Sequence, residues 1–480
     1  MKFVNRVSEL AALEKRYKTE NPEFMIIYGK RRAGKTELIK KFFKDKPHIY
    51  FLADKRSDLD QLKELAEKTG EYFNDSFILR NGFSDWISVF EYFREKLKTK
   101  DEKNEKLIFV VDEFPYLVNS NNAIPSLFQK GWDEYLKELN IFLILCGSSI
   151  SMMEKETLSH KSPLYGRRTG QFMIEPMDFK KMRQYFPGLD LEKAVMFYSI
   201  LGGTPEYWKH FPPGMEVIEN INENVIRKDA FLYNEIEFIL REELREPKNY
   251  FSIIRSISFG KTKLNEIVMD TGLERGTVSK YLETLESLKL IKREIPVTEK
   301  HPHKSRKGIY IIEDNFFNFW FRFVYPNRGY VEEGRAEYVL EEKIKPHLNT
   351  FAGHGFEGIC REILIEMDIA GKLPFMGGEI GRWWEKDTEI DIISKKESSS
   401  EVLFCECKWK DNVSFDVLNK LKKKTELVEW EKHKRKEYFM LFAKSFNPEF
   451  KKYLEDNNIL CVDLEYIQEF ITLIYKFILL

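Results

Sequence analysis

The segment Gly29-Lys30-Arg31-Arg32-Ala33-Gly34-Lys35-Thr36 has the G-x-x-x-x-G-K-T spacing of a P-loop. A strand-like apolar run over 24–28 enters it, and a helix-like run over 37–43 leaves it. Its glycines allow backbone N–H groups to turn around phosphate oxygens, and the following helix directs its positive N-terminus at the same anion. Lys35 can reach the β- and γ-phosphates, and the Thr36 hydroxyl can bind Mg²⁺. We therefore expect a strand–loop–helix unit that binds a nucleoside triphosphate.

The composition sets further limits. The 480 residues suggest about three domains. With Lys+Arg 77 and Asp+Glu 78 the formal net charge is −1, so a nucleic-acid surface has to come from local patches. The five cysteines show no metal-ligand spacing and no dense disulfide framework, which is typical of a reducing, cytoplasmic setting. The N-terminus lacks a signal-peptide core and the apolar run at 470–480 is too short for a bilayer, so we expect no membrane contact.

Apolar runs alternate with helix-like segments up to about residue 210, which predicts a parallel α/β sheet. One of these runs, 107–111, is followed by Asp112 and Glu113. A continuous apolar run that ends in acids suits a strand buried on both faces. Asp112 can hold the Mg²⁺ shell, and Glu113 can polarise the water that attacks the γ-phosphate.

Two further segments can complete the nucleotide site. The apolar run 141–146 ends in Gly147-Ser148-Ser149, and in P-loop sheets with an inserted strand this end lies near the γ-phosphate. Either serine could sense that phosphate, and a simple turn at the strand end is the alternative. Arg167 or Arg168 could stabilise transition-state charge, within the chain or across the interface of a homo-oligomer. A surface salt bridge is an equally good interpretation of these arginines.

Several motifs follow one another along the chain: Phe3-x-x-Arg6-x-x-Glu9-Leu10, GKRRAGKT, VVDEFPYL, LCGSS, SPLYGRRTG and LGGTPEYW at 201–208. This succession resembles the archaeal-type AAA+/STAND ATPases, and the resemblance covers most of the chain. It implies that ATP is the nucleotide, that Arg6 lies by the adenine, and that Gly203-Thr204-Pro205 closes over the nucleotide from a small helical lid. We accordingly expect an ATPase core over 1–178 and a helical lid over 179–250.

Residues 251–312 show a different pattern. Three helix-like segments that begin near 251, 264 and 276 precede two strand-like runs around a basic loop. Helix, helix–turn–helix and β-hairpin together make a winged helix. Because the local excess of basic residues is small, contact with DNA and a structural or regulatory role remain open alternatives. The aromatic run 314–323 is predicted as a buried connector that completes a 251–330 domain, with a base-stacking platform as the alternative.

Charged residues interrupt two strand-like runs near the C-terminal end. Asp391 lies in 389–393, and Glu406 and Lys408 lie in 402–409. Period-two spacing puts Glu406 and Lys408 on one strand face, where charges in an apolar strand need a function. If the strands pair, Asp391 and Glu406 would hold one or two Mg²⁺ ions, and Lys408 would orient a water or stabilise charge. Glu357 on the preceding helix could complete the metal shell.

This arrangement resembles the PD-(D/E)XK nuclease fold, with Ile390 at the usual proline position. The resemblance implies a restriction-endonuclease-like α/β domain over 331–480. Glu389 and Lys410 share the same strand faces and could take the same roles. Lysines at 420–424 could contact phosphates, and a solvated helix is an equally good interpretation.

These patterns predict an ATP-binding and ATP-hydrolysing switch that controls a nucleic-acid-directed, metal-dependent nuclease-like domain. The expected partner is nucleic acid, DNA in the first place, bound through the winged helix and the C-terminal domain. The alternative is a STAND-like, ATP-dependent regulator that binds DNA or protein and whose C-terminal domain does not cut. No motif for a small-molecule phosphate acceptor is visible, which favours a switch over a metabolic kinase.

Overall fold

The chain divides into two compact units, Met1–Pro176 and Met177–Leu480, in a computed structural model of the protein. Residues 6–98, 105–244 and 246–478 are described. The first unit ends at Pro176, next to the end predicted for the ATPase core at residue 178. Phe3, which belongs to the first motif, lies outside the described residues.

The first unit is built on a five-stranded parallel sheet in the order β2-β3-β4-β1-β5. Its strands are β1 (Glu23–Tyr28), β2 (His48–Leu52), β3 (Leu107–Asp112), β4 (Ile141–Gly147) and β5 (Gly170–Met173). β1, β3 and β4 are buried along their whole length, as continuous apolar runs require when both sheet faces are covered. The predicted parallel α/β sheet is confirmed, and β4 lies between β1 and β3 so that their carboxyl ends meet at one edge.

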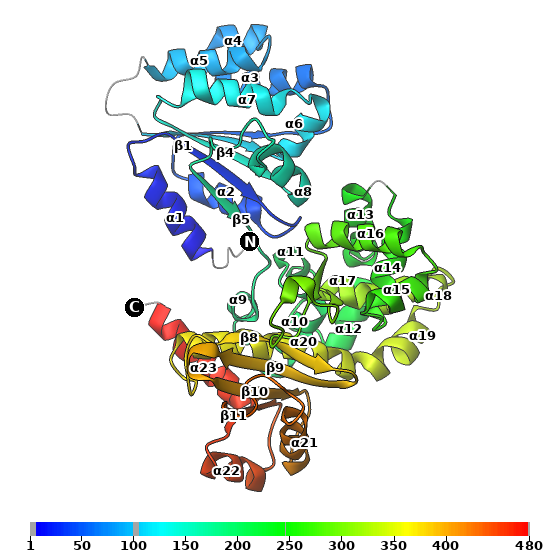
Figure 1. Cartoon of the computed structure of the whole chain (residues 1–480). Helices are drawn as coiled ribbons and strands as arrows, with labels where there is room; N and C mark the ends of the chain where they lie inside the picture. Colours follow the sequence, from blue (N-terminus) through cyan, green and yellow to red (C-terminus); the bar gives the residue numbers. More distant parts are fainter. Residues whose placement is uncertain (1–5, 99–104, 245, 479–480) are drawn as a thin grey trace. The chain divides into compact units, whose positions relative to one another are not determined.

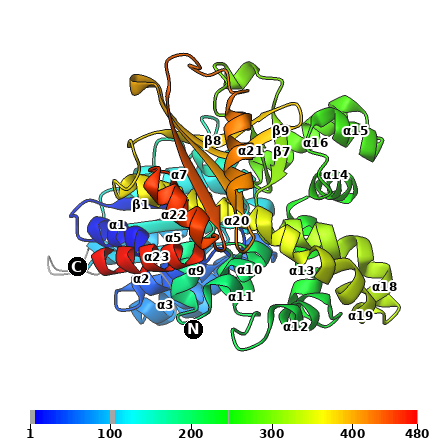
Figure 2. The same cartoon turned by 90° about the horizontal axis from the view of Figure 1, so that it is seen from below.

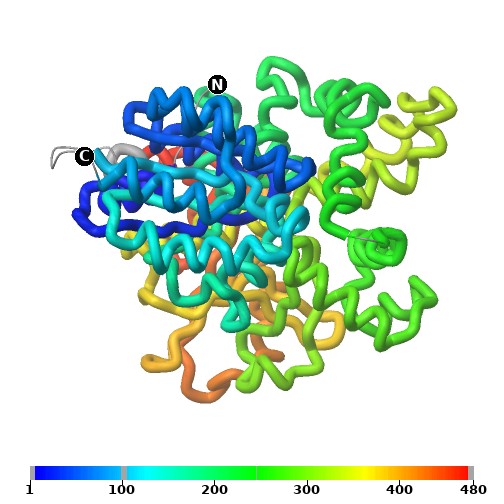
Figure 3. The backbone as a smooth tube through the Cα atoms, turned by 90° about the horizontal axis from the view of Figure 1, so that it is seen from above, coloured from blue at the N-terminus to red at the C-terminus, as the bar shows by residue number. Residues whose placement is uncertain are grey.

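Helices cover both faces of this sheet (Figure 1). On one face α1 (Val7–Tyr17) and α2 (Lys35–Phe43) bury apolar side chains against β1 and β4. On the other face a larger layer of helices packs against the sheet, and each of these helices buries apolar side chains there. The backbone of this layer runs from blue to cyan in Figure 3. That layer contains α3 (Asp58–Phe73), α4 (Ser76–Asn81), α5 (Trp86–Lys98), α6 (Phe114–Ser120), α7 (Ile124–Gly131) and α8 (Ile150–Met153).

The second unit has a helical segment in the region predicted as a lid. Its helices are α9 (Phe179–Tyr185), α10 (Leu191–Leu201), α11 (Pro205–Trp208), α12 (Val217–Ile221) and α13 (Phe231–Glu243). α10 is buried on nearly all sides, because later helices of the same unit pack around it.

The region predicted as a winged helix contains three helices and a two-stranded antiparallel hairpin. These elements are α14 (Lys248–Ser258), α15 (Leu264–Thr271), α16 (Arg275–Ser287), β6 (Ile291–Glu294) and β7 (Ile309–Ile312). The Glu266 carboxylate caps α15, because it accepts the backbone N–H groups of Thr262 and Lys263, each at 3.1 Å.

The aromatic run after β7 is buried, so it is not an exposed stacking surface. Phe316, Phe319 and Phe321 are fully buried, and the buried indole N–H of Trp320 donates to the carbonyl of Tyr233 at 2.7 Å. The run forms α17 (Asn315–Phe319) and the π-helical segment Trp320–Val324 that follows it. Two short helices, α18 (Arg328–Glu332) and α19 (Ala336–Tyr338), lead from there to the long helix α20 (Lys345–Ile369).

A five-stranded mixed sheet in the order β12-β11-β10-β9-β8 follows α20. β8, β9 and β10 are antiparallel, whereas β10, β11 and β12 are parallel. The strands are β8 (Glu379–Glu385), β9 (Thr388–Lys396), β10 (Glu401–Lys408), β11 (Lys436–Ala443) and β12 (Leu460–Val462).

Helices α20 and α21 (Phe415–Thr425) cover opposite faces of this second sheet (Figure 2). Leu403 and Cys405 pack with the core that contains α20, whereas Phe404 packs with Leu418 and Leu421 of α21. The chain continues through α22 (Pro448–Asp456) and α23 (Leu464–Ile478). Within the ranges that the structure describes, no helix is both long and apolar enough to cross a membrane.

Candidate functional site

The P-loop lies between β1 and α2, at the carboxyl edge of the first sheet. Gly29 has a φ of +149°, and a Cβ there would lie 2.3 Å from the carbonyl oxygen of Ile174, so only glycine fits. Gly34 has a φ of +92° and precedes α2, and a Cβ there would meet no described atom within 4 Å. The loop therefore leaves open space at the helix N-terminus, where backbone N–H groups favour an anion.

Lys35 is folded back over this loop. Its side chain is buried, and its ammonium donates to the carbonyls of Gly29 at 3.0 Å and Lys30 at 2.9 Å. Burial lowers the pKa of Lys35, because desolvation disfavours the charged form. The loop carbonyls thus hold the ammonium where phosphate oxygens could replace them as its partners.

Parallel strands bring the predicted Mg²⁺ residues together beside the loop. The Thr36 hydroxyl donates to a carboxylate oxygen of Asp112 at 2.8 Å. The Tyr50 hydroxyl donates to the same oxygen, also at 2.8 Å, and this contact was not predicted from the sequence. Asp112 is almost completely buried at the end of β3. The pair therefore has the oxygen donors that Mg²⁺ prefers, and its role as a metal site stays a prediction.

Glu113 lies beside Asp112 and faces the end of β4. It has a left-handed backbone, with a φ of +54°, and begins the turn into α6. The Ser148 hydroxyl lies 2.9 Å from both of its carboxylate oxygens, and the Ser148 N–H donates to one of them at 3.4 Å. Of the two serines that the sequence left open, Ser148 thus contacts the predicted water-polarising carboxylate.

The Arg6 guanidinium contacts the backbone of the P-loop. Its guanidinium donates to the carbonyl of Ala33 at 3.0 Å and to that of Glu175 at 2.7 Å, and it pairs with Glu9 at 2.9 Å. The structure therefore places Arg6 against the P-loop backbone, and its predicted position by the adenine stays a prediction. Pro205 begins α11 in the second unit, and its role over the nucleotide also stays a prediction.

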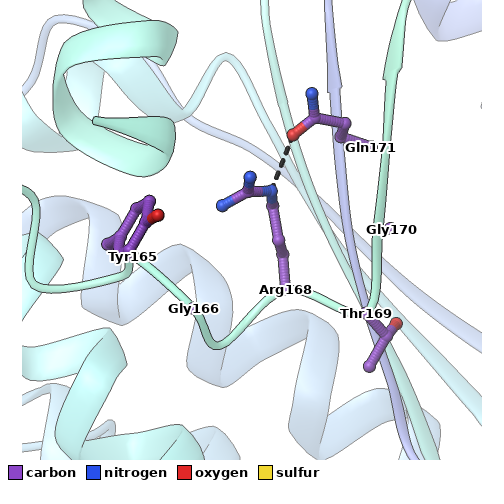
Figure 4. Close-up of a pocket in the computed structure, with 6 residues that line it drawn as sticks. All are labelled: Tyr165, Gly166, Arg168, Thr169, Gly170 and Gln171. Atoms are coloured by element: carbon purple, nitrogen blue, oxygen red, sulfur yellow. Dashed lines mark hydrogen bonds between the residues drawn. The ribbon is translucent and has the colours of Figure 1, made fainter. Parts of the chain in front are cut away.

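Arg167 and Arg168 lie at the opposite edge of the sheet from the P-loop. β5 runs parallel to β1, so the residues before Gly170 lie at the amino ends of the strands. About 13 Å of strand separates this level from the P-loop. Arg167 pairs with Asp133 at 3.2 Å, and Arg168 donates to Gln171 at 2.6 Å in a shallow pocket (Figure 4). The role of either arginine at a nucleotide stays a prediction, and Arg167 forms the alternative salt bridge.

A second group of charged residues meets where β9 and β10 pair. The register places Ile392 opposite Cys405, so the next residues along the two strands are Asp391 and Glu406. The Lys408 ammonium lies 2.8 Å from a Glu406 oxygen and 3.8 Å from an Asp391 oxygen. The Cys407 N–H donates to Asp391 at 2.8 Å. The three residues that the sequence singled out are therefore in one place.

The carboxylates of this group repel one another. Burial raises the pKa of Asp391 to about 7, and the charges of Glu406 and Glu357 add to the effect. Burial alone would lower the pKa of Lys408, but the charges of Asp391 and Glu406 outweigh it and raise the pKa. A cation bound between the carboxylates would relieve this repulsion.

Two neighbours of the group were not recognised as part of it from the sequence. The Lys424 ammonium, on α21, binds both oxygens of Glu406 at 2.7 and 2.9 Å. The sequence suggested Lys424 only as a phosphate contact. Arg382, on β8, lies 3.6 Å from Glu357 and 2.8 Å from Glu389. The only local sequence feature that marked Arg382 was its position among the aromatic residues of a strand.

The carboxylates of Asp391 and Glu406 suit one hard cation that keeps water ligands better than a site in which the protein supplies every ligand. Two carboxylates with water are a common way to hold Mg²⁺. Among the side chains that the structure describes, no group of three or more His, Cys, Asp or Glu is arranged to hold a metal ion. Glu357, the predicted third ligand, therefore does not join Asp391 and Glu406 in such a group, and its role as a ligand stays a prediction.

Glu362 links helix α20 to the start of the second unit. It lies on α20, the helix that carries Glu357, and accepts the N–H of Phe179 at 2.8 Å. The Tyr198 hydroxyl lies 2.9 Å from its other oxygen and 3.1 Å from the carbonyl of Met177. Burial raises the pKa of Glu362 to about 7, and the charge of Asp178 adds to it. A protonated Glu362 can donate to Tyr198, which frees the tyrosine proton for Met177.

We expect Glu362→Gln to remove a pH-dependent loss of stability. The folded protein raises the pKa of this carboxyl from 4.5 to about 7. The stabilisation that the protonated carboxyl contributes to the fold is therefore complete below pH 4.5. It is lost as the pH rises through 7. At pH 8 the variant should be more stable than the wild type by up to about 3 kcal/mol. At pH 4.5 the two should agree, as measured by urea unfolding.

Glu366→Gln is the matched control for this experiment, because it lies one turn further along α20 and forms a more exposed ion pair with Lys180 at 2.5 Å. It should gain no stability at pH 8. Equal stability of Glu362→Gln and wild type at pH 8 would show that Glu362 is ionised without penalty.

Comparisons with known proteins match two regions of the chain to protein families. Residues 3–211 match the profile of a family described as an ATPase domain predominantly from Archaea. Residues 320–426 match a second family, described as archaeal and bacterial proteins of unknown function. The protein MJECL04 of Methanocaldococcus jannaschii is 36% identical over 469 residues, which cover 96% of this chain and 99% of that protein.

Two further comparisons cover parts of the chain. The ATP-binding protein MJ0423 of Methanocaldococcus jannaschii is 50% identical over 44 residues, which cover 9% of this chain and 75% of that protein. The solved structure of the Walker-type ATPase PABY2304 of Pyrococcus abyssi has a TM-score of 0.48 and 21% identity, and covers 66% of this chain and 95% of that chain.

Proposed function

We propose that this chain, which belongs to the family of the Methanocaldococcus jannaschii protein MJECL04 and contains an archaeal-type ATPase domain, is an ATP-hydrolysing switch that controls a metal-dependent nuclease-like domain. The observation that carries the nuclease part is the meeting of Asp391, Glu406 and Lys408 at one end of paired strands. The ATPase part rests on the P-loop and on the acids beside it.

In the proposed ATPase reaction a water oxygen attacks the γ-phosphorus, the bond to the bridging oxygen breaks, and ADP and phosphate leave. Glu113 orients the water, and Ser148 positions Glu113. The Lys35 ammonium stabilises the negative charge that develops on the phosphate oxygens, while Thr36 and Asp112 would hold Mg²⁺. The name of the relative MJ0423, an ATP-binding protein, supports ATP as the nucleotide.

In the proposed nuclease reaction water attacks a backbone phosphorus of nucleic acid, and one P–O ester bond breaks. A divalent cation held by Asp391 and Glu406 would lower the pKa of a bound water and neutralise charge on the phosphate. Lys408, which already contacts both carboxylates, would turn its ammonium to the phosphate and stabilise the charge of the transition state. The leaving oxygen takes up a proton from water, so the products are a hydroxyl end and a phosphate end.

A cleavage assay tests this proposal. The purified protein is incubated with labelled DNA and RNA strands in ATP with Mg²⁺ or Mn²⁺. We expect metal-dependent shortening of at least one of these substrates and no cleavage in EDTA. If no substrate is cut in either metal, the nuclease part of the proposal is wrong.

One observation favours a second candidate function, a nucleotide-dependent regulator that binds DNA or protein without cutting. Lys408 and Lys424 both bind Glu406, so two ammonium groups already neutralise one of the two carboxylates that Mg²⁺ would need. This candidate predicts that ATP-dependent DNA retention survives Asp391→Ala. Loss of retention in that variant would count against it.

A further inference from the structure

The second unit contains a cavity of about 550 Å³ that reaches the proposed nuclease site. Its walls come from the predicted winged helix, the aromatic connector, α20 and the strands β8 and β9. Asp391, Glu357 and Glu389 line it, so a molecule in the cavity would lie next to a carboxylate of the site. The volume lies within the roughly 300–1,000 Å³ that pockets for small ligands have, so it can receive a nucleotide or two but no double helix.

Apolar and charged side chains both line this cavity. Its apolar lining includes Ile309, Phe323 and Phe351, which come from β7, the connector and α20, and the two phenylalanines are buried and pack against each other. Its charged lining includes Arg361 and Arg382 beside the carboxylates. A nucleotide presents groups of both kinds, an apolar base and a charged phosphate.

One residue of the lining, Arg382, has a hydrogen-bond donor without an acceptor among the described residues. The Nε–H of Arg382 is buried and has no hydrogen-bond partner in the described part of the chain, although its terminal nitrogen pairs with Glu389 at 2.8 Å. A buried donor without a partner is costly and therefore rare. A phosphate oxygen is an acceptor that would satisfy it.

The loop between β6 and β7 is held against β8, the strand from which Gly381 and Arg382 line the cavity. The Val297 N–H donates to the carbonyl of Arg382 at 2.9 Å, as in strand pairing. The Trp384 indole N–H donates to the carbonyl of Lys307 at 3.1 Å, and the Lys307 ammonium pairs with Glu385 at 2.8 Å.

We propose that this cavity receives the end of a single-stranded nucleic acid, so that the substrate is a single strand rather than an intact duplex. This inference rests on the proposed nuclease function and adds the substrate class. The base lies among the apolar side chains of the lining, and the phosphate lies by Arg382 and Asp391. Because cationic and acidic side chains in the lining nearly balance, the strand binds well only when a divalent cation neutralises the carboxylates.

Gly358 offers a way to fill the cavity without disturbing the fold. It lines the cavity from α20, and a Cβ there would meet no described atom within 4 Å. Glycine inside a helix is less stable than alanine by up to about 1 kcal/mol, so Gly358→Ala and Gly358→Leu should fold at least as well as the wild type. Gly329→Leu is the matched control, because Gly329 is an exposed helical glycine with open space around it and does not line the cavity.

The test measures binding of a fluorescent 12-nucleotide single strand and of a blunt hairpin duplex in Ca²⁺, which binds carboxylates with a looser geometry than Mg²⁺. The wild type should bind the single strand at least about tenfold more tightly than the duplex, a difference of about 1.4 kcal/mol. Gly358→Ala should weaken single-strand binding slightly, Gly358→Leu at least tenfold, and Gly329→Leu not at all. Cleavage rates in Mg²⁺ should follow the same order.

Three results would overturn the inference. The first is unchanged single-strand binding and cleavage in Gly358→Leu, and the second is a duplex bound and cut as well as the single strand. The third is competition by thymidine 5′-monophosphate at the affinity of the strand, which would make the cavity a site for a free nucleotide. Each of these leaves the proposed nuclease function standing, whereas absence of cleavage on every substrate would remove that function itself.

Discussion

Replacement of Lys35 by alanine is expected to abolish ATP hydrolysis, with a fall in turnover of at least about 10²–10³-fold. The Lys35 ammonium is the cation that the P-loop carbonyls hold within reach of the phosphates. Negative charge develops on the γ-phosphate oxygens as the bond to ADP breaks, and the buried Lys35 ammonium is placed to stabilise it. Release of inorganic phosphate from ATP measures the effect directly.

Lys46→Ala is the control for that substitution. Lys46 follows α2, is half-buried, and also makes two contacts, with the carboxylate of Glu14 at 2.7 Å and with the carbonyl of Phe42 at 2.5 Å. Its loss removes comparable interactions from the same unit but none from the P-loop, so ATP turnover should persist. Wild-type turnover in Lys35→Ala would mean that hydrolysis occurs elsewhere, and the account of the first unit would fail.

Asp391→Asn is expected to abolish metal-dependent cleavage and to weaken Mn²⁺ binding. The amide keeps the shape of the carboxyl and its hydrogen bond from Cys407, but it has no charge for the metal. We expect cleavage to fall by about 10²–10⁴-fold, the range typical of a lost catalytic group. Calorimetric titration with Mn²⁺ reports on the site independently of catalysis.

The pH dependence of Mn²⁺ binding provides a second test of Asp391 as a metal ligand. Because burial and neighbouring carboxylates raise the pKa of Asp391 to about 7, protons compete with the metal below that pH. Affinity in the wild type should rise with pH up to about 7 and then level off, and Asp391→Asn should lose this dependence. Asp387→Asn, in the exposed turn between β8 and β9, should behave as the wild type. Unchanged affinity and cleavage in Asp391→Asn would exclude Asp391 from the site.

Much of the first unit could be predicted, because its chemistry lies at the ends of buried parallel strands. Continuous apolar runs marked β1, β3 and β4, and residues that end such strands meet at one edge of the sheet. The contact of Ser148 with Glu113 follows from that rule. By the same rule, the backbone of Arg167 and Arg168 lies at the other edge, because these residues precede β5.

The surroundings of the second site were harder to predict, because they depend on contacts between distant segments. Glu406 and Lys408 share a strand face by their spacing alone, whereas Lys424 reaches Glu406 from a helix 18 residues further on. The pairing of Val297 with Arg382 joins segments more than 80 residues apart and leaves no local pattern. The sequence left contact with DNA and a structural role open for this region, and the structure shows its loop bound to β8.

The nucleotide dependence of cleavage tests the central claim most directly. Cleavage of a labelled single strand in Mg²⁺ is compared in ATP, in ADP and without nucleotide, for the wild type and for Lys35→Ala. Coupling between two sites is typically 5–150-fold, so the wild-type rate should differ at least about fivefold between ATP and ADP. The difference should vanish in Lys35→Ala while basal cleavage remains. Equal rates in all three conditions, in a protein that hydrolyses ATP and cuts the strand, would contradict the claim that the ATPase controls the second site.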